Sequence, residues 1–323
     1  MTTMTPDQAS WFSETFQRLV GHVEQAVLGK TSTVELALTC MLSEGHLLLE
    51  DVPGTGKTSL AKALANTVEG THSRIQFTPD LLPSDVTGVT IYDQRTGQFD
   101  FHAGPIFATV VLADEINRAS PKTQSALLEV MEEGRVTVDG RAYPVGPPFM
   151  VIATQNPIEQ AGTYRLPEAQ LDRFLMRTSL GYPDHSTTVT LLSEAATRDR
   201  AAGISPLITS KAVSDMASLA TQVYTDASVL AYIARIVEET RNAPEIRLGV
   251  SVRGALAYTR AAKTFAASRG RNYVTPDDVK ALAHPILEHR IIIDPEAEFA
   301  GATVPGVVDR IIADVQPPAE RAA

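Results

Sequence analysis

The sequence predicts an α/β fold, in which helices cover both faces of a parallel sheet, followed by a smaller all-α domain. In the first 182 residues, short apolar runs typical of buried strands alternate with segments of helical periodicity, and this alternation favours a parallel sheet. Residues 183–316 show helical patterns and no convincing strand. We therefore expect one domain over residues 1–182, a second over residues 183–316, and a disordered tail at residues 317–323.

Composition narrows the possible classes of function. The chain has 323 residues, of which 44% are hydrophobic and 20% are charged, as is typical of globular proteins. Its formal net charge of −10 disfavours a protein whose main task is to grip nucleic acid. No apolar run is long enough to span a membrane, and the first residues lack a signal-peptide pattern. The single cysteine, Cys40, lies in an apolar helical run, so we expect a buried thiol in a reducing compartment, the cytoplasm.

The first third of the chain predicts helices, a buried strand and a hairpin, in that order. Residues 6–27 carry apolar side chains at helical spacing, and a second helical pattern ends at residue 42. The apolar run 47–49 predicts the first buried strand, and a glycine-rich turn and an amphipathic helix follow it. A short strand is expected at residues 74–77. Alternating apolar residues around Arg-Thr-Gly then predict a β-hairpin at residues 92–101.

Two more buried strands flank a helix and a second hairpin. The strands are expected at residues 110–113 and 149–154, and the helix at residues 123–133. An Asp-Gly pair between alternating segments predicts the hairpin at residues 136–145. Beyond residue 183, helices are expected at residues 186–199, 210–222, 228–241, 251–268 and 276–287.

The turn after the first strand predicts a phosphate-binding loop. Its sequence is Asp51-Val52-Pro53-Gly54-Thr55-Gly56-Lys57-Thr58-Ser59. Glycines let backbone N–H groups surround phosphate oxygens, and the start of the next helix adds partial positive charge. Lys57 is expected to reach the β- and γ-phosphates of ATP, and the Thr58 hydroxyl to hold Mg²⁺. Asp51 stands where the general pattern has glycine; we expect the turn to survive because Asp tolerates left-handed backbone.

Polar residues at the ends of the other buried strands supply the remaining chemistry. Ligands of open α/β sheets bind at the carboxyl ends of the strands. Asp114 is therefore expected to hold Mg²⁺, and Glu115 to polarise the water that attacks the γ-phosphate. Asn156, after the third strand, is expected to orient the same water. Phosphoryl transfer also needs positive charge at the γ-phosphate, and Arg173 and Arg253 are the candidates.

These motifs resemble those of the MoxR family of AAA+ ATPases, over roughly residues 16–315. The matching runs are Pro53-Gly54-Thr55-Gly56-Lys57-Thr58 (Walker A), Asp114-Glu115-Ile116-Asn117-Arg118-Ala119 (Walker B and its extension), Ala153-Thr154-Gln155-Asn156-Pro157 (sensor 1), Leu166-Pro167-Glu168-Ala169-Gln170-Leu171-Asp172-Arg173-Phe174, and Ser251-Val252-Arg253 (sensor 2).

The resemblance implies an αβα AAA+ core, a helical lid that closes over ATP, and a ring, usually a hexamer, with active sites between subunits. It implies that Arg173 is a finger acting in trans and Arg253 the sensor of the lid, with Arg165 and Arg177 as rival fingers. It also implies that Leu28 and Gly29 lie near the adenine.

The resemblance further implies a Mg²⁺-dependent ATPase that remodels or matures partner proteins in the manner of a chaperone. Such partners often carry von Willebrand factor A domains. The two hairpins would couple nucleotide state to the partner; the alternative is that they decorate the edge of the core without a contact role. Two other functions stay open on the same fold. One is a nucleic-acid motor, which the acidic charge disfavours, and the other is a nucleotide-gated binding scaffold with negligible turnover.

Overall fold

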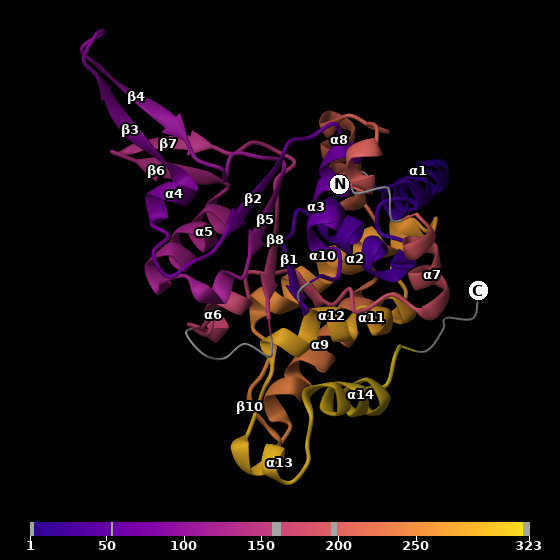
Figure 1. The fold of residues 1–323 in the computed structure, drawn as a ribbon. Coiled ribbons are helices and arrows are strands. Elements are labelled where there is room, and N and C mark those ends of the chain that lie inside the picture. Colours follow the sequence, from indigo (N-terminus) through magenta and orange to yellow (C-terminus); the bar gives the residue numbers. More distant parts are fainter. Residues whose placement is uncertain (1–2, 53, 157–162, 195–198, 319–323) are drawn as a thin grey trace.

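A parallel five-stranded sheet forms the centre of the computed structural model, which describes residues 3–52, 54–156, 163–194 and 199–318 (Figure 1). The strand order is β2-β5-β8-β1-β9, and every pairing in this sheet is parallel. The strands are β1 (Leu47–Glu50), β2 (His72–Gln76), β5 (Val110–Asp114), β8 (Met150–Gln155) and β9 (Met176–Thr178). The α/β class and the four sheet strands expected from the sequence are confirmed; β9, only three residues long, was not predicted.

Helices cover both faces of this sheet because its strands are apolar on both sides. Alternate residues along a strand point to opposite faces. One face packs with α3 (Lys57–Thr67), and the other packs with α5 (Pro121–Glu133). The first face presents Leu47, Leu49, Val110, Leu112, Met150 and Ile152, and the second presents Leu48, Ile75, Val111, Ala113, Val151 and Ala153.

Two amino-terminal helices join the core to the lid. They are α1 (Pro6–Glu24) and α2 (Thr31–Leu42), and their apolar side chains belong to one buried cluster with the first sheet face and the lid helices. Ser13 donates a hydrogen bond to the carbonyl oxygen of Ser268, and Asn272 donates one to that of Met4. On α2, Cys40 is fully buried as expected, and burial raises the pKa of its thiol well above the usual range.

Both predicted hairpins are present, and the first projects from the body of the molecule (Figure 1). It follows the short helix α4 (Pro83–Thr87) and pairs β3 (Gly88–Asp93) with β4 (Gln98–Ala103). The second pairs β6 (Arg135–Val138) with β7 (Arg141–Pro144). The rings of Phe101 and Tyr143 stack with centroids 4.0 Å apart, so the two hairpins contact each other.

The carboxy-terminal half is mainly helical, and the expectation that it is all-α is wrong in one detail. A short antiparallel pair, β10 (Ile246–Leu248) with β11 (Ile292–Ile293), lies within it. Strands of three and two residues are too short for alternation to reveal them. The helices are α6 (Glu168–Leu171), α7 (His185–Ser193), α8 (Ser210–Ala220), α9 (Ala227–Asn242), α10 (Val252–Ser268), α11 (Pro276–Ala281), α12 (Ala283–Leu287), α13 (Pro295–Phe299) and α14 (Val304–Asp314), with 3₁₀ turns η2 (Arg200–Gly203) and η3 (Glu288–Arg290). A further 3₁₀ turn, η1 (Ile116–Arg118), follows β5 in the core.

Two boundaries expected from the sequence stay predictions. The limit at residues 182/183 falls between β9 and α7, and most of the expected tail lies outside the described residues. Within the described ranges, no helix combines the length and the apolar character that crossing a bilayer requires.

Candidate nucleotide-binding site

Two glycines shape the loop between β1 and α3. Gly54 and Gly56 have φ angles of 85° and 96°, a left-handed region that side chains rarely adopt. Gly56 also caps the amino terminus of α3, where helices offer N–H groups and partial positive charge to an anion. The Nζ of Lys57 donates hydrogen bonds to the carbonyl oxygens of Asp51 and Val52, both at 3.3 Å. Pro53 lies outside the described residues.

Asp51 has a different role from the one expected. Its φ is not positive, so tolerance of left-handed backbone does not explain the residue. Instead, its buried carboxylate accepts hydrogen bonds from the backbone N–H groups of Leu180, at 2.6 Å, and Gly181, at 2.9 Å. Asp51 thereby ties the start of the glycine loop to the segment that leads from β9 into the lid. A glycine could not make these two bonds.

A cavity of about 250 Å³ brings together most of the residues predicted to hold phosphate, metal and the attacking water. It lies where β1, β5 and β8 end, as expected for ligands of an open α/β sheet. It also contains two residues from β2 that the sequence analysis missed, Arg74 and Gln76. The full lining is Gly54, Gly56, Lys57, Thr58, Ser59, Arg74, Gln76, Asp114, Glu115 and Asn156.

Thr154 holds the carboxylate of Asp114 and the backbone of Glu115 at the end of β5. Its hydroxyl donates to one oxygen of Asp114 at 2.6 Å and accepts a hydrogen bond from the backbone N–H of Glu115 at 2.9 Å. Glu115 has left-handed backbone, with φ 56° and ψ 48°, which is uncommon for a residue other than glycine. Strained backbone of this kind clusters at functional sites, where surrounding contacts hold it.

Both carboxylates already have cationic or amide partners. Arg74 lies 2.6 Å from the second oxygen of Asp114. One oxygen of Glu115 accepts hydrogen bonds from Gln76, at 2.8 Å, and from Arg118, at 3.0 Å. The β2–β5 register, which pairs Gln76 with Asp114, brings Arg74 and Gln76 to these carboxylates, but register is not visible in the sequence.

The donor set fits Mg²⁺ bound together with a nucleotide. Mg²⁺ prefers oxygen ligands in octahedral geometry and is usually held by one or two protein groups, phosphate oxygens and water. The Thr58 hydroxyl and the Asp114 carboxylate line the same cavity and provide such oxygens. In the part of the chain that the structure describes, no group of three or more His, Cys, Asp or Glu side chains could hold a metal.

The two candidate arginines lie together, but not in this cavity. Arg173 is 3.1 Å and Arg253 is 2.7 Å from the two carboxylate oxygens of Glu132, near the end of α5. Leu175 bonds to His46, the residue before β1, which places this segment at the amino end of the sheet. The glycine loop follows the carboxyl end of β1. Each residue of the strand adds roughly 3.3 Å to the distance between its two ends. Arg253 therefore does not reach the cavity of its own chain. This position differs from the expectation that Arg253 is a sensor of the lid that closes over ATP in that cavity.

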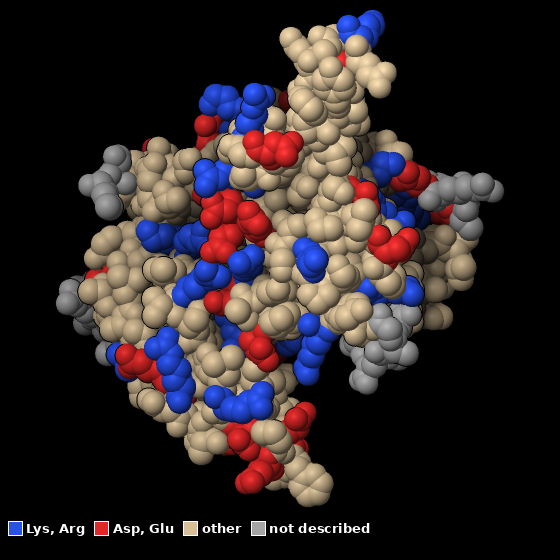
Figure 2. All heavy atoms as spheres, turned by 90° about the vertical axis from the view of Figure 1, so that its left-hand side faces the viewer, with Lys and Arg blue, Asp and Glu red and all other residues tan. Residues whose placement is uncertain are grey.

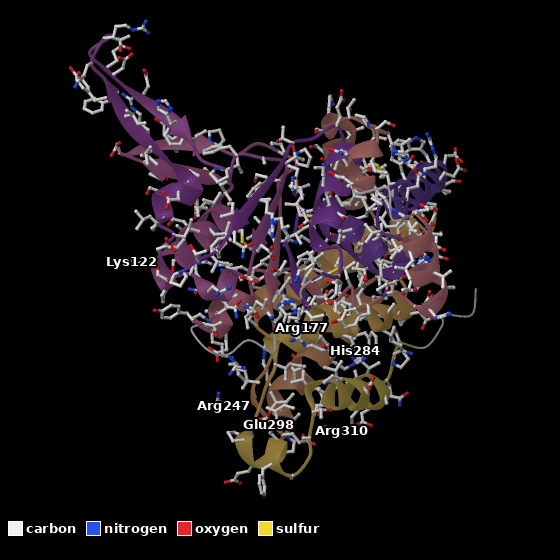
Figure 3. All side chains as sticks on the ribbon, viewed as in Figure 1. Lys122, Arg177, Arg247, His284, Glu298 and Arg310 are labelled. Carbon is white, nitrogen blue, oxygen red and sulfur yellow. The ribbon has the colours of Figure 1, made fainter. Side chains whose placement is uncertain are left out.

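The rival finger Arg177 bridges the core and the lid within the chain (Figure 3). Its guanidinium pairs with Glu50 at 3.1 Å and with Glu288 at 2.8 Å. Arg165 and Arg177 both line a second cavity of about 690 Å³, next to Asn156. Arg177 is paired with two carboxylates and Arg173 with one, and which of the three arginines acts as the finger stays a prediction.

Leu28 and Gly29 lie beside the start of the lid. Gly29 has φ 69°, and a Cβ there would lie 2.7 Å from the hydroxyl oxygen of Thr187 on α7. The next residue, Lys30, donates to the carbonyl oxygen of Tyr182 at 2.8 Å. Neither Leu28 nor Gly29 is among the described residues that line the nucleotide cavity, so an adenine contact stays a prediction.

Comparison with known proteins identifies the family. Residues 46–176 match the ATPase family associated with various cellular activities (AAA), and residues 238–311 match the AAA lid domain. The chain is 47% identical to the uncharacterised protein YeaC of Bacillus subtilis, covering 95% of this chain and 96% of that one. It is 38% identical to Chaperone MoxR1 of Mycobacterium tuberculosis, over 94% and 82%. A crystal structure of a proposed ATPase from Cytophaga hutchinsonii superposes with a TM-score of 0.90 at 37% identity, covering 97% and 98%. The chain therefore belongs to the MoxR family of AAA+ ATPases.

Proposed function

We propose that this protein is a Mg²⁺-dependent ATPase that works as a ring and remodels partner proteins in the manner of a chaperone. The observation that carries the proposal is the single cavity in which the glycine loop, Asp114, Glu115 and Asn156 meet. A loop of this kind offers N–H groups to phosphate, and the carboxylates offer a metal ligand and a base.

Each side chain of the cavity has a distinct task in hydrolysis. Lys57 and the loop N–H groups hold the phosphates. Thr58 and Asp114 would hold Mg²⁺, and a bound Mg²⁺ would supply positive charge against the developing charge on the phosphate oxygens. Glu115 accepts a proton from the attacking water, and Asn156 orients that water. Gln76 and Arg118 hold Glu115 until it turns to the water.

The arginine pair supports assembly of identical copies. Arg173 and Arg253 lie beyond the far end of β1, yet phosphoryl transfer gains from positive charge at the γ-phosphate. Arginines that cannot reach their own cavity can serve the cavity of a neighbour. An interface between unlike faces closes into a ring when the rotation allows, and we propose a hexamer.

Steady-state phosphate release tests the hydrolysis proposal. We expect Glu115→Gln to bind ATP with wild-type affinity and to hydrolyse it about 10²- to 10⁴-fold more slowly, because the base is lost. Lys57→Ala should lose ATP binding in calorimetry. The matched control is Glu129→Gln, on the exposed side of α5, which should turn over at the wild-type rate. Wild-type turnover in Glu115→Gln would remove Glu115 as the base. ATP binding without turnover in the wild type would favour a nucleotide-gated scaffold.

The first hairpin supports contact with a partner protein rather than nucleic acid. Its strands expose large apolar side chains, with Phe99 69% exposed. Figure 2 shows this hairpin at the top of the view, with little charge apart from its tip. One relative is named a chaperone. We therefore propose that the hairpin contacts a client in the cytoplasm, possible examples being proteins with a von Willebrand factor A domain. The other large apolar residues that this hairpin exposes are Val89, Ile91 and Tyr92.

Capture of clients by the ATP-trapped variant tests this part. In the presence of ATP, the single variant Glu115→Gln should retain specific proteins that the double variant carrying both Glu115→Gln and Phe99→Ser does not retain. Equal capture by both proteins would remove the hairpin as the contact. Binding of DNA that weakens steeply with salt would favour the nucleic-acid motor instead.

A further inference from the structure

A buried arginine of the lid holds the loop that carries Arg173. The side chain of Arg290 is only 2% exposed. Its Nε donates to the carboxylate of Asp172 at 2.7 Å, and its Nη2 donates to the carbonyl oxygen of Phe174 at 2.6 Å. Its Nη1 donates to the carbonyl oxygen of Leu175 at 3.2 Å. One lid side chain therefore fixes the backbone on both sides of Arg173.

The same carboxylate also fixes the helix that carries Arg253. The second oxygen of Asp172 accepts a hydrogen bond from the Ser251 hydroxyl at 2.7 Å. Ser251 caps α10 by accepting from the backbone N–H of Gly254 at 3.0 Å. A Cβ on Gly254 would lie 2.9 Å from the Cδ of Arg290, so the start of α10 packs directly on this arginine.

Asp172 is thus the shared anchor of two segments that each carry one arginine of the pair. The first segment ends the core and the second belongs to the lid, yet both arginines reach Glu132. A buried ion pair is weak support for a purely stabilising role, because apolar side chains of similar volume often stabilise as well. The planar guanidinium of Arg290 donates in fixed directions to the carboxylate of Asp172 and to the carbonyl oxygens of Phe174 and Leu175, so it fixes the orientation of this segment.

We propose that Arg290 is a positioning residue for hydrolysis, which through Asp172 and Ser251 holds Arg173 and Arg253 as a pair directed at the nucleotide of a neighbouring copy. This inference rests on the proposed ATPase function. We call the contacts among Arg290, Asp172 and Ser251 the lock. These contacts lie away from the cavity of their own chain, so their loss should slow turnover without weakening ATP binding. A displacement of about 1 Å at a reacting group can cost about a hundredfold in rate.

Three variants of the full-length protein test the lock. Asp172→Ala removes the shared anchor, Arg290→Lys keeps the charge without the fork, and Ser251→Ala removes both the bond to Asp172 and the cap of α10 at an exposed site. The matched control is Thr303→Ala, since Thr303 caps α14 in the same way through Gly306 and does not touch the arginine loop. We expect turnover to fall about tenfold to a hundredfold in Asp172→Ala and severalfold in Ser251→Ala, with ATP affinity unchanged. The control should stay within about twofold of the wild type.

Mixing with Lys57→Ala subunits separates positioning from general damage. Those subunits lack an ATP site but keep their arginine pair, so they should complete the intact ATP site of an Asp172→Ala neighbour. Random mixing in equal amounts should restore about a quarter of the wild-type rate per subunit, the share of interfaces with both halves intact. Wild-type turnover in all three lock variants, or a loss that Lys57→Ala subunits do not restore, would overturn the lock. Absence of turnover in the wild type would instead refute the proposed function, and the lock with it.

Discussion

Asp51 offers a sharp test of the contact between the glycine loop and the lid segment. Its carboxylate accepts two backbone hydrogen bonds, from Leu180 and Gly181, and the residue is 4% exposed. A hydrogen bond to a charged group contributes about 1.5–3 kcal/mol to stability. A buried donor left without an acceptor adds the desolvation penalty of that donor. We expect Asp51→Ala to lower the free energy of unfolding by about 3 kcal/mol, and Asp51→Asn, which keeps one acceptor, by about half as much.

Urea unfolding followed by circular dichroism measures this loss through the midpoint and the slope of the transition. The matched control is Asp93→Ala, since Asp93 accepts one backbone hydrogen bond at an exposed hairpin turn. That variant should stay within about 1 kcal/mol of the wild type. If Asp51→Ala is no less stable than Asp93→Ala, the two bonds do not hold the loop to the lid segment.

The pKa values of two histidines are shifted in opposite directions, so we expect the two residues to change the stability in opposite ways with pH. Burial lowers the pKa of His46 to about 4, so its stabilisation is complete above about pH 6.5 and is lost as the pH falls toward 4, by up to about 3 kcal/mol. His46→Asn should flatten this acid limb of the unfolding free energy, and an unchanged limb would contradict the assignment. Burial alone would lower the pKa of His284, but hydrogen bonds to Glu288 and Asp309 outweigh it and raise that pKa. Its stabilisation is therefore complete below about pH 6.5 and is lost as the pH rises through the raised value. His284→Gln should remove this loss in the same urea assay. Identical pH profiles of the unfolding free energy for the wild type and His284→Gln would rule out this contribution of His284.

The sheet and the glycine loop were predictable because their signals are local. The β5 residues before Asp114 are all buried and apolar, and the carboxylates of Asp114 and Glu115 stand out at the end of this run. Both hairpins carry turn residues between alternating segments. These features depend on neighbours a few residues away. The sequence alone therefore placed the residues of the cavity that follow β1, β5 and β8.

The remaining parts of the site depend on contacts between distant segments. The partners of Asp51 lie 129 and 130 residues further along the chain. The meeting of Arg173 and Arg253 on Glu132 depends on how the lid packs on the core. No periodicity encodes such distances. An arginine such as Arg290 is ordinarily exposed, so its burial was equally invisible.

The bonds from α1 to the lid bear on how the chain folds as it is synthesised. Ser13 meets Ser268 and Met4 meets Asn272, at sequence separations of 255 and 268. α1 can pack against α2 and α3 early in synthesis, but its contacts with α10 form only after most of the described chain has been made. Contacts between such distant segments slow folding and leave apolar surface exposed in the meantime.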